Sequence, residues 1–134
     1  MMFKFGLALG AVMCAASSLH AEVVDCTYKT NEKSFITDRY IFAYEQGNPE
    51  AAVIDGYIKY KLGKPQDAKL EARGDKLLFT WKIPVKDMYG ATANMYYRNT
   101  LDPKTMTAKM TAMAAGVPGE AINFTASGKC EVTD

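Results

Sequence analysis

Apolar and polar residues alternate with a period of two along most of the chain after residue 22. The alternation is clearest over 76–86, where one face would carry Leu77, Phe79, Trp81, Ile83 and Val85 and the other Lys76, Thr80, Lys82 and Lys86. Similar alternation marks 106–114 and 53–63, and it is weaker over 34–44. A period of two is typical of strands with one face on a core, so these ranges are predicted to be antiparallel β-strands.

Short segments rich in Gly, Pro, Asn and Asp separate these runs, at 47–49, 63–65, 74–75 and 102–104. Such residues tolerate or pre-set turn angles, and 74–75 and 102–104 are predicted to be hairpin tips. No segment after residue 21 shows a helical period. The pattern predicts an all-β fold, a single antiparallel β-barrel or sandwich of about eight strands in meander order.

The first 21 residues differ from the rest and have the layout of a secretory signal peptide. Lys4 precedes an apolar run over 5–16, and small residues follow, with Ala21 as the predicted last residue removed and Ala16 or Ser18 as alternatives. The apolar run is shorter than the roughly 20 residues that span a bilayer, so no integral membrane segment is expected after processing. The prediction is a single β domain over 22–134 that is periplasmic or secreted.

Cysteine use agrees with export. Cys14 lies in the segment predicted to be removed, which leaves Cys26 and Cys130, 104 positions apart. An even number of cysteines in an exported chain predicts a disulfide, whereas redox or metal-binding pairs usually lie close together in sequence. The Cys26–Cys130 bridge would close nearly the whole domain.

Charge and histidine content narrow the function classes. Without Lys4, the chain has 15 basic and 15 acidic residues, a balance that disfavours nucleic acid and anionic membrane surfaces as partners. The single histidine, His20, lies in the predicted signal peptide, so the mature chain has no imidazole for a catalytic triad or for metal ligation. No catalytic residue, cofactor or metal site is therefore predicted. A hydrolase based on two carboxylates is the remaining enzymatic alternative, although no spacing singles out a pair.

Two further groups of residues offer binding chemistry. Thioethers bind Cu(I), and Met106, Met110 and Met113 follow one another at spacings of four and three, but core packing is the favoured interpretation. A possible binding surface comprises Tyr89, Tyr96, Tyr97 and Arg98. Because Tyr96 and Tyr97 are adjacent on a predicted strand, they should point to opposite faces.

These observations predict a non-enzymatic binding protein that holds a small apolar ligand within a barrel. The alternative is a module that binds or inhibits another protein of the cell envelope. The layout of Cys26 near the start, Cys130 near the end and strands between resembles that of small periplasmic inhibitors of lysozyme. The resemblance is one of layout alone and assigns no site residues.

Overall fold

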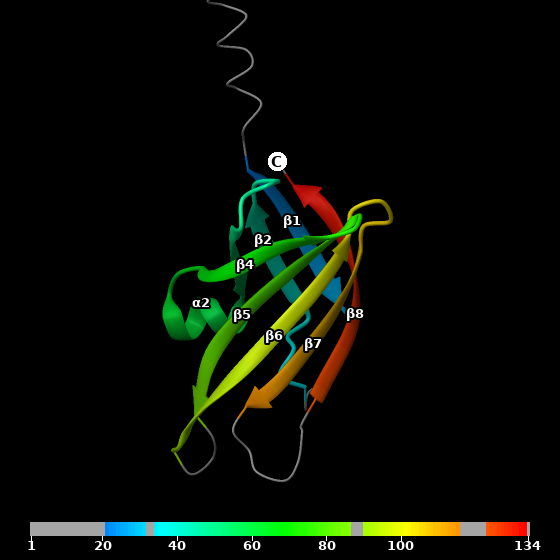
Figure 1. Ribbon diagram of the computed structural model, residues 1–134. Coiled ribbons are helices and arrows are strands. Elements are labelled where there is room, and N and C mark those ends of the chain that lie inside the picture. The colour runs from blue at the N-terminus through cyan, green and yellow to red at the C-terminus, as the bar shows by residue number, and fades with distance from the viewer. Residues whose placement is uncertain (1–20, 32–33, 87–89, 116–122, 134) are drawn as a thin grey trace, which may run out of the picture.

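Eight antiparallel strands pair edge to edge in chain order, and the last closes on the first (Figure 1). This computed structural model describes residues 21–31, 34–86, 90–115 and 123–133. The elements are β1 Glu22–Tyr28, β2 Arg39–Tyr44, β3 Glu50–Asp55, α2 Gly56–Leu62, β4 Gln66–Arg73, β5 Lys76–Lys86, β6 Thr92–Asp102, β7 Thr107–Ala115 and β8 Asn123–Thr133. The predicted all-β meander is confirmed, and the β1–β8 pairing makes it a barrel rather than a sandwich.

The barrel interior is filled largely by aromatic side chains. Phe42 and Phe79 have no exposed surface, and their ring centroids lie 4.8 Å apart. Trp81 stacks on Tyr97 with a centroid separation of 5.2 Å. Full burial of such a side chain stabilises the fold by roughly 1.5 to 3 kcal/mol, so this aromatic cluster contributes much of the core energy.

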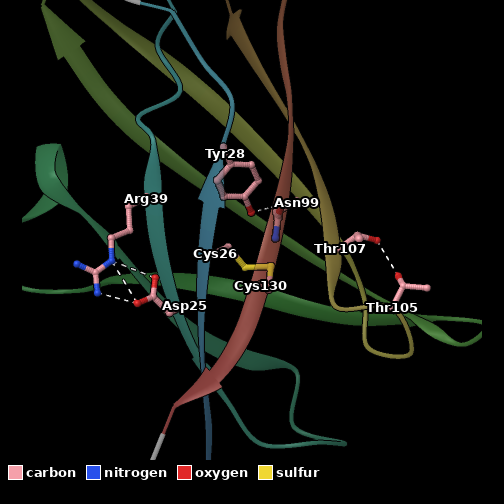
Figure 2. Close-up of a disulfide and its surroundings, with 8 residues drawn as sticks. All are labelled: Asp25, Cys26, Tyr28, Arg39, Asn99, Thr105, Thr107 and Cys130. Atoms are coloured by element: carbon pink, nitrogen blue, oxygen red, sulfur yellow. Dashed lines mark hydrogen bonds and ion pairs between the residues drawn. A yellow bond between two sulfur atoms is a disulfide. The ribbon is translucent and has the colours of Figure 1, made fainter.

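A disulfide joins the two strands that close the barrel. Cys26 on β1 and Cys130 on β8 are direct partners in the strand register, and their sulfur atoms are bonded (Figure 2). The predicted bridge is therefore confirmed. It links residues 104 positions apart, a separation for which the chain-entropy account gives about 4 to 5 kcal/mol of stabilisation.

The prediction of one strand over 53–63 was wrong after residue 55, where α2 follows β3 directly. The Asp55 side chain accepts a hydrogen bond from the Ile58 N–H at 2.8 Å and so caps the helix start. Gly63 ends the helix in a left-handed conformation, with its N–H donating to the carbonyls of Ile58 and Lys59. Ile58 faces the core, whereas 81% of Tyr60 is exposed.

The two ends of the barrel differ in their connections. Short turns join β2 to β3, β4 to β5 and β6 to β7 at one end, and the last two include the predicted hairpin tips. At the other end, β1, β5 and β7 end and β2, β6 and β8 begin, and α2 connects β3 to β4 toward that end (Figure 1). The predicted signal peptide lies outside the described residues. Within the described ranges, no helix combines the length and hydropathy needed to cross a bilayer.

Candidate functional site

A polar pair lies within the apolar interior of the barrel. Tyr28, at the end of β1, donates its hydroxyl hydrogen to Oδ1 of Asn99 on β6 at 2.7 Å (Figure 2). Asn99 has no exposed surface and Tyr28 only 3%. Burial raises the pKa of Tyr28 far above its ordinary value, which keeps the hydroxyl protonated as the donor of this bond.

Two buried donors in the same region have no hydrogen-bond partner among the described residues, Nδ2 of Asn99 and Nε1 of Trp81. They come from neighbouring strands. Asn99 pairs with Phe79 and Trp81 pairs with Tyr97, so Trp81 and Asn99 occupy diagonal positions on the inner face of β5 and β6. A buried donor without an acceptor costs about 1 to 3 kcal/mol, so this part of the interior favours an acceptor atom from a bound molecule or water.

The inner faces of β7 and β8 carry several small residues. Ala108, Ala112 and Ala126 are buried there, with Met110 between the first two. Gly128 lies opposite Tyr28 in the register, and a Cβ at this position would lie 2.6 Å from the Tyr28 ring. These small residues share the side of the barrel near Asn99, which pairs with Met110, and the Tyr28 ring covers Gly128 there.

A second polar cluster ties residues 34–38 to the α2 end of the barrel. Asp55 accepts a hydrogen bond from the Thr37 hydroxyl, and the Tyr97 hydroxyl donates to the Phe35 carbonyl at 2.8 Å. The Thr37 N–H donates to the Tyr40 hydroxyl at 3.2 Å. Burial, reinforced by the Asp55 charge, raises the pKa values of Tyr40 and Tyr97. Because these hydroxyls and the carboxylate already have partners, the cluster acts as a structural tie.

The predicted tyrosine surface is only partly assembled. Tyr96 and Arg98 point outward from β6, and Tyr96 is 42% exposed. Tyr97 is 6% exposed and points inward, so it is unavailable to a partner at the surface. The opposite orientation of Tyr96 and Tyr97 is as predicted from strand geometry. Tyr89 lies outside the described residues, while Met113, 40% exposed and paired with Tyr96, extends the outer patch.

The methionines do not converge on one point. Met110 has no exposed surface and faces the interior, whereas Met113 faces solvent on the other side of β7. Met106 sits in the β6–β7 turn. The described residues contain no group of three or more His, Cys, Asp or Glu side chains suited to holding a metal ion.

The strand register also gathers lysines that are far apart in sequence. An open groove of about 760 Å³ on the outer face is lined by residues from β1, β8, β7, β6 and the start of β5. Four of its lining residues are Lys29, Lys76, Lys109 and Lys129. The groove could not be predicted from the sequence, because its lysines belong to segments that only the folded barrel brings together. Comparison of the chain with protein-family models, with curated proteins and with solved structures finds no match in any of the three.

Proposed function

We propose that the protein is an exported, non-enzymatic binding protein that holds one small, mainly apolar molecule inside its barrel. The observation that carries the proposal is the pair of neighbouring buried donors, Trp81 Nε1 and Asn99 Nδ2, for which the described residues supply no acceptor. An eight-stranded barrel is wide enough either to be filled by side chains or to hold one small ligand. A ligand acceptor beside either donor would satisfy it.

The surroundings define the class of ligand. It must be small, because Tyr40, Phe42 and Phe79 are buried and in mutual contact through Phe42, and they occupy the side of the barrel formed by β2 and β5. It must be largely apolar and uncharged, because the core around Trp81 is hydrophobic and burial of an unpaired ion is costly. One carbonyl or ether oxygen is the feature that the two donors would recognise.

Export and the absence of catalysis rest on separate observations. The layout of residues 1–21 is that of a signal peptide, and disulfides such as Cys26–Cys130 persist in oxidising compartments, so we place the protein in the periplasm or outside the cell. From residue 22 onward the chain has no histidine, and both of its cysteines are bridged. This composition favours binding over acid–base or nucleophilic chemistry. The alternative role, binding of an envelope protein through the tyrosine surface, is less favoured because Tyr97 is buried.

Native mass spectrometry of the protein purified from its own host tests the proposal. We expect a bridged polypeptide with a discrete small-molecule increment that disappears on denaturation. A bare polypeptide mass under the same conditions would refute a tightly held ligand and would leave water as the partner of the two donors. The same spectrum measures the processed N-terminus.

A fluorescence titration tests the site itself, because Trp81 is the only tryptophan of the chain. The probe is prodan, an apolar naphthalene with one ketone acceptor, and binding inside the barrel should give saturable energy transfer from Trp81. Asn99→Leu removes a donor and should weaken binding about tenfold, the equivalent of one lost hydrogen bond.

Tyr28→Phe is the matched control for this variant. It deletes the hydroxyl bonded to Asn99 Oδ1 but leaves the Nδ2 donor in place, so the affinity for prodan should change less than threefold, about 0.6 kcal/mol. Equal affinity in the parent protein and in Asn99→Leu would show that this donor does not recognise the ligand.

A further inference from the structure

A groove lies on the outer face of the barrel, where outward side chains of β6, β7, β8 and β1 come together. Its volume of about 760 Å³ lies within the range of sites that bind small molecules or short polymer segments. It crosses the β1–β8 seam, where Thr27 and Lys129 form the register pair next to Cys26 and Cys130. Figure 1 shows β8 lying between β7 and β1 along this side of the barrel.

Two rows of outward side chains form the groove. In the first row, Thr27 pairs with Lys129, Lys129 with Thr107, and Thr107 with Asp102. At a strand spacing of about 4.8 Å these four positions span about 14 Å. In the second row, Ser127 pairs with Lys109, and Lys109 with Thr100.

The two rows alternate lysines with hydroxyl groups. Lys129 has a threonine on either side, and Lys109 lies between a serine and a threonine. The backbone N–H of Lys29 donates to the Ser127 carbonyl at 3.0 Å, which anchors this third lysine beside the second row. Cationic and hydroxyl groups are therefore interleaved across the floor and rim of the groove.

The groove carries a local positive charge on a chain that is close to neutral. Four lysines and one acidic residue, Asp102, line it, a net of +3. None of the four lysines takes part in an ion pair within the part of the chain that the structure describes. Their ammonium groups are consequently available to an anionic ligand.

We propose that this groove binds an anionic polysaccharide whose acidic groups are carboxylates or sulfates. Lysines are strongly hydrated point charges on flexible stems, which suit anions spaced along a chain, and the hydroxyls between them can bond to sugar hydroxyls. The lining contains no arginine and no exposed aromatic residue, the groups that favour nucleic acids through bidentate contacts and base stacking.

Binding of this kind is local and sensitive to salt. Exposed lysines contribute little individually, and salt screens charges more than about 10 Å apart at 0.1 M ionic strength. By analogy with counterion release on other polyanions, three or four contacts should lower the affinity about a hundredfold between 50 and 200 mM salt. The proposal does not rest on the interior ligand, because the lysines and hydroxyl groups that carry it lie at outward strand positions. Tyr28 lines the groove and also bonds to Asn99 inside the barrel, so binding at both sites is measured for each variant.

The test measures binding of fluorescently labelled polygalacturonate and heparin, a carboxylated and a sulfated polysaccharide, by polarisation at low salt. Lys109→Glu with Lys129→Glu should weaken binding at least tenfold. Lys59→Glu with Lys64→Glu is the matched control, because it makes the same change in net charge at exposed lysines outside the groove and should change the affinity less than threefold. Prodan binding and the melting temperature should be similar in both variants, which separates loss of the groove from loss of the fold or of the interior site.

The outcomes are distinguishable. Loss of binding in the groove variant alone supports the proposal, and the preferred probe identifies the acidic group. Equal losses of polysaccharide affinity in the Lys109/Lys129 and Lys59/Lys64 variants, or no loss in either variant, overturn the proposal. Tighter binding of duplex DNA or of phosphatidylglycerol vesicles than of either polysaccharide at the same ionic strength would overturn it in favour of a nucleic acid or a membrane surface.

Discussion

Gly128→Ala is the substitution for which the structure gives the sharpest stability prediction. Gly128 on β8 lies opposite Tyr28, whose ring covers it. A Cβ built at this position would lie 2.6 and 2.9 Å from two ring carbons of Tyr28 and 2.8 Å from the Thr27 carbonyl oxygen. Distances below 3.0 Å require something to move. The ring cannot move freely, because Tyr28 is 3% exposed and its hydroxyl is bonded to Asn99.

The cost follows from what must be displaced. Forcing extra volume into a packed core costs about 1 to 3 kcal/mol. Loss of the Tyr28–Asn99 hydrogen bond would add about 1 kcal/mol. We therefore expect Gly128→Ala to lower the free energy of unfolding by about 2 to 4 kcal/mol, which for a domain near 100 residues lowers the melting temperature by about 8 to 16 °C.

Thermal unfolding with the disulfide intact, followed by circular dichroism, measures this effect. Ser127→Ala, one residue earlier and facing solvent, is the control and should change stability by less than about 0.5 kcal/mol. In a Tyr28→Ala background, Gly128→Ala should cost at least about 1 kcal/mol less, because the ring contacts are gone and only the Thr27 carbonyl remains. This account of the packing would be refuted if Gly128→Ala left the melting temperature unchanged. It would also be refuted if Gly128→Ala lowered the free energy of unfolding equally in the parent protein and in Tyr28→Ala.

Three further predictions concern other parts of the fold. Met106 packs against the core and adopts a left-handed backbone conformation with a φ of 54°. Met106→Ala and Met106→Gly both lose the side-chain packing, but only glycine relieves the backbone strain, so the glycine variant should be more stable than the alanine variant by about 1 kcal/mol in urea unfolding. A glycine variant less stable than the alanine variant would contradict the strain. Replacing Cys26 and Cys130 with alanine should lower stability by about 3 to 5 kcal/mol, and added reductant should then leave the variant's melting temperature unchanged. Burial raises the pKa of four tyrosines, that of Tyr44 to about 12, whereas unfolded tyrosines titrate near 10. The folded state therefore retains protons that the unfolded chain releases, so stability should be full below about pH 10 and fall as the pH rises toward 12. Phenolate absorbance from all four while near-ultraviolet dichroism remains native would contradict this.

The strands could be predicted from sequence because one face of the sheet meets the core and the other meets water. β5 has the predicted bounds, Lys76–Lys86, and Leu77, Phe79, Trp81 and Ile83 are buried as their parity requires. The choice between barrel and sandwich could not be made in the same way. It depends on β1 pairing with β8, a contact between the two ends of the domain, to which the Cys26–Cys130 bridge is the only pointer in the sequence.

The helix was missed because its spacing is ambiguous. Ile54 and Ile58 are four apart, which fits one face of a strand and also one face of a helix. The deciding signals were the ends of the segment, Asp55 as a helix cap and Gly63 as a left-handed stop. Read with those caps, the seven residues from Gly56 to Leu62 form a helix that buries Ile58 and exposes Tyr60.

The interior site around Asn99 was easier to predict from the sequence than the lysine groove. Asn99 lies between Tyr97 and Leu101 at inward positions of β6, so a polar residue in an apolar series was visible before the fold was known. Its unpartnered Nδ2 donor was not visible, because the hydroxyl that donates to Oδ1 comes from Tyr28, 71 positions away. The groove was hidden more completely, since only the register brings Lys29, Lys109 and Lys129 together.

The overall charge balance of the chain conceals the local charge of the groove. Residues 22–134 carry 15 basic and 15 acidic side chains, so a groove with a net charge of +3 leaves the remaining surface at −3. A neutral protein of this kind gains no long-range attraction to a polyanion from its total charge, so attraction depends on the local charge of the groove. A polyanion would then bind at the groove because the lysines are clustered there. A variant with the same net charge but with its lysines distributed over the whole surface would lose this preference for the groove. The paired comparison of the Lys109/Lys129 and Lys59/Lys64 charge reversals measures this distinction, because both variants have the same total charge.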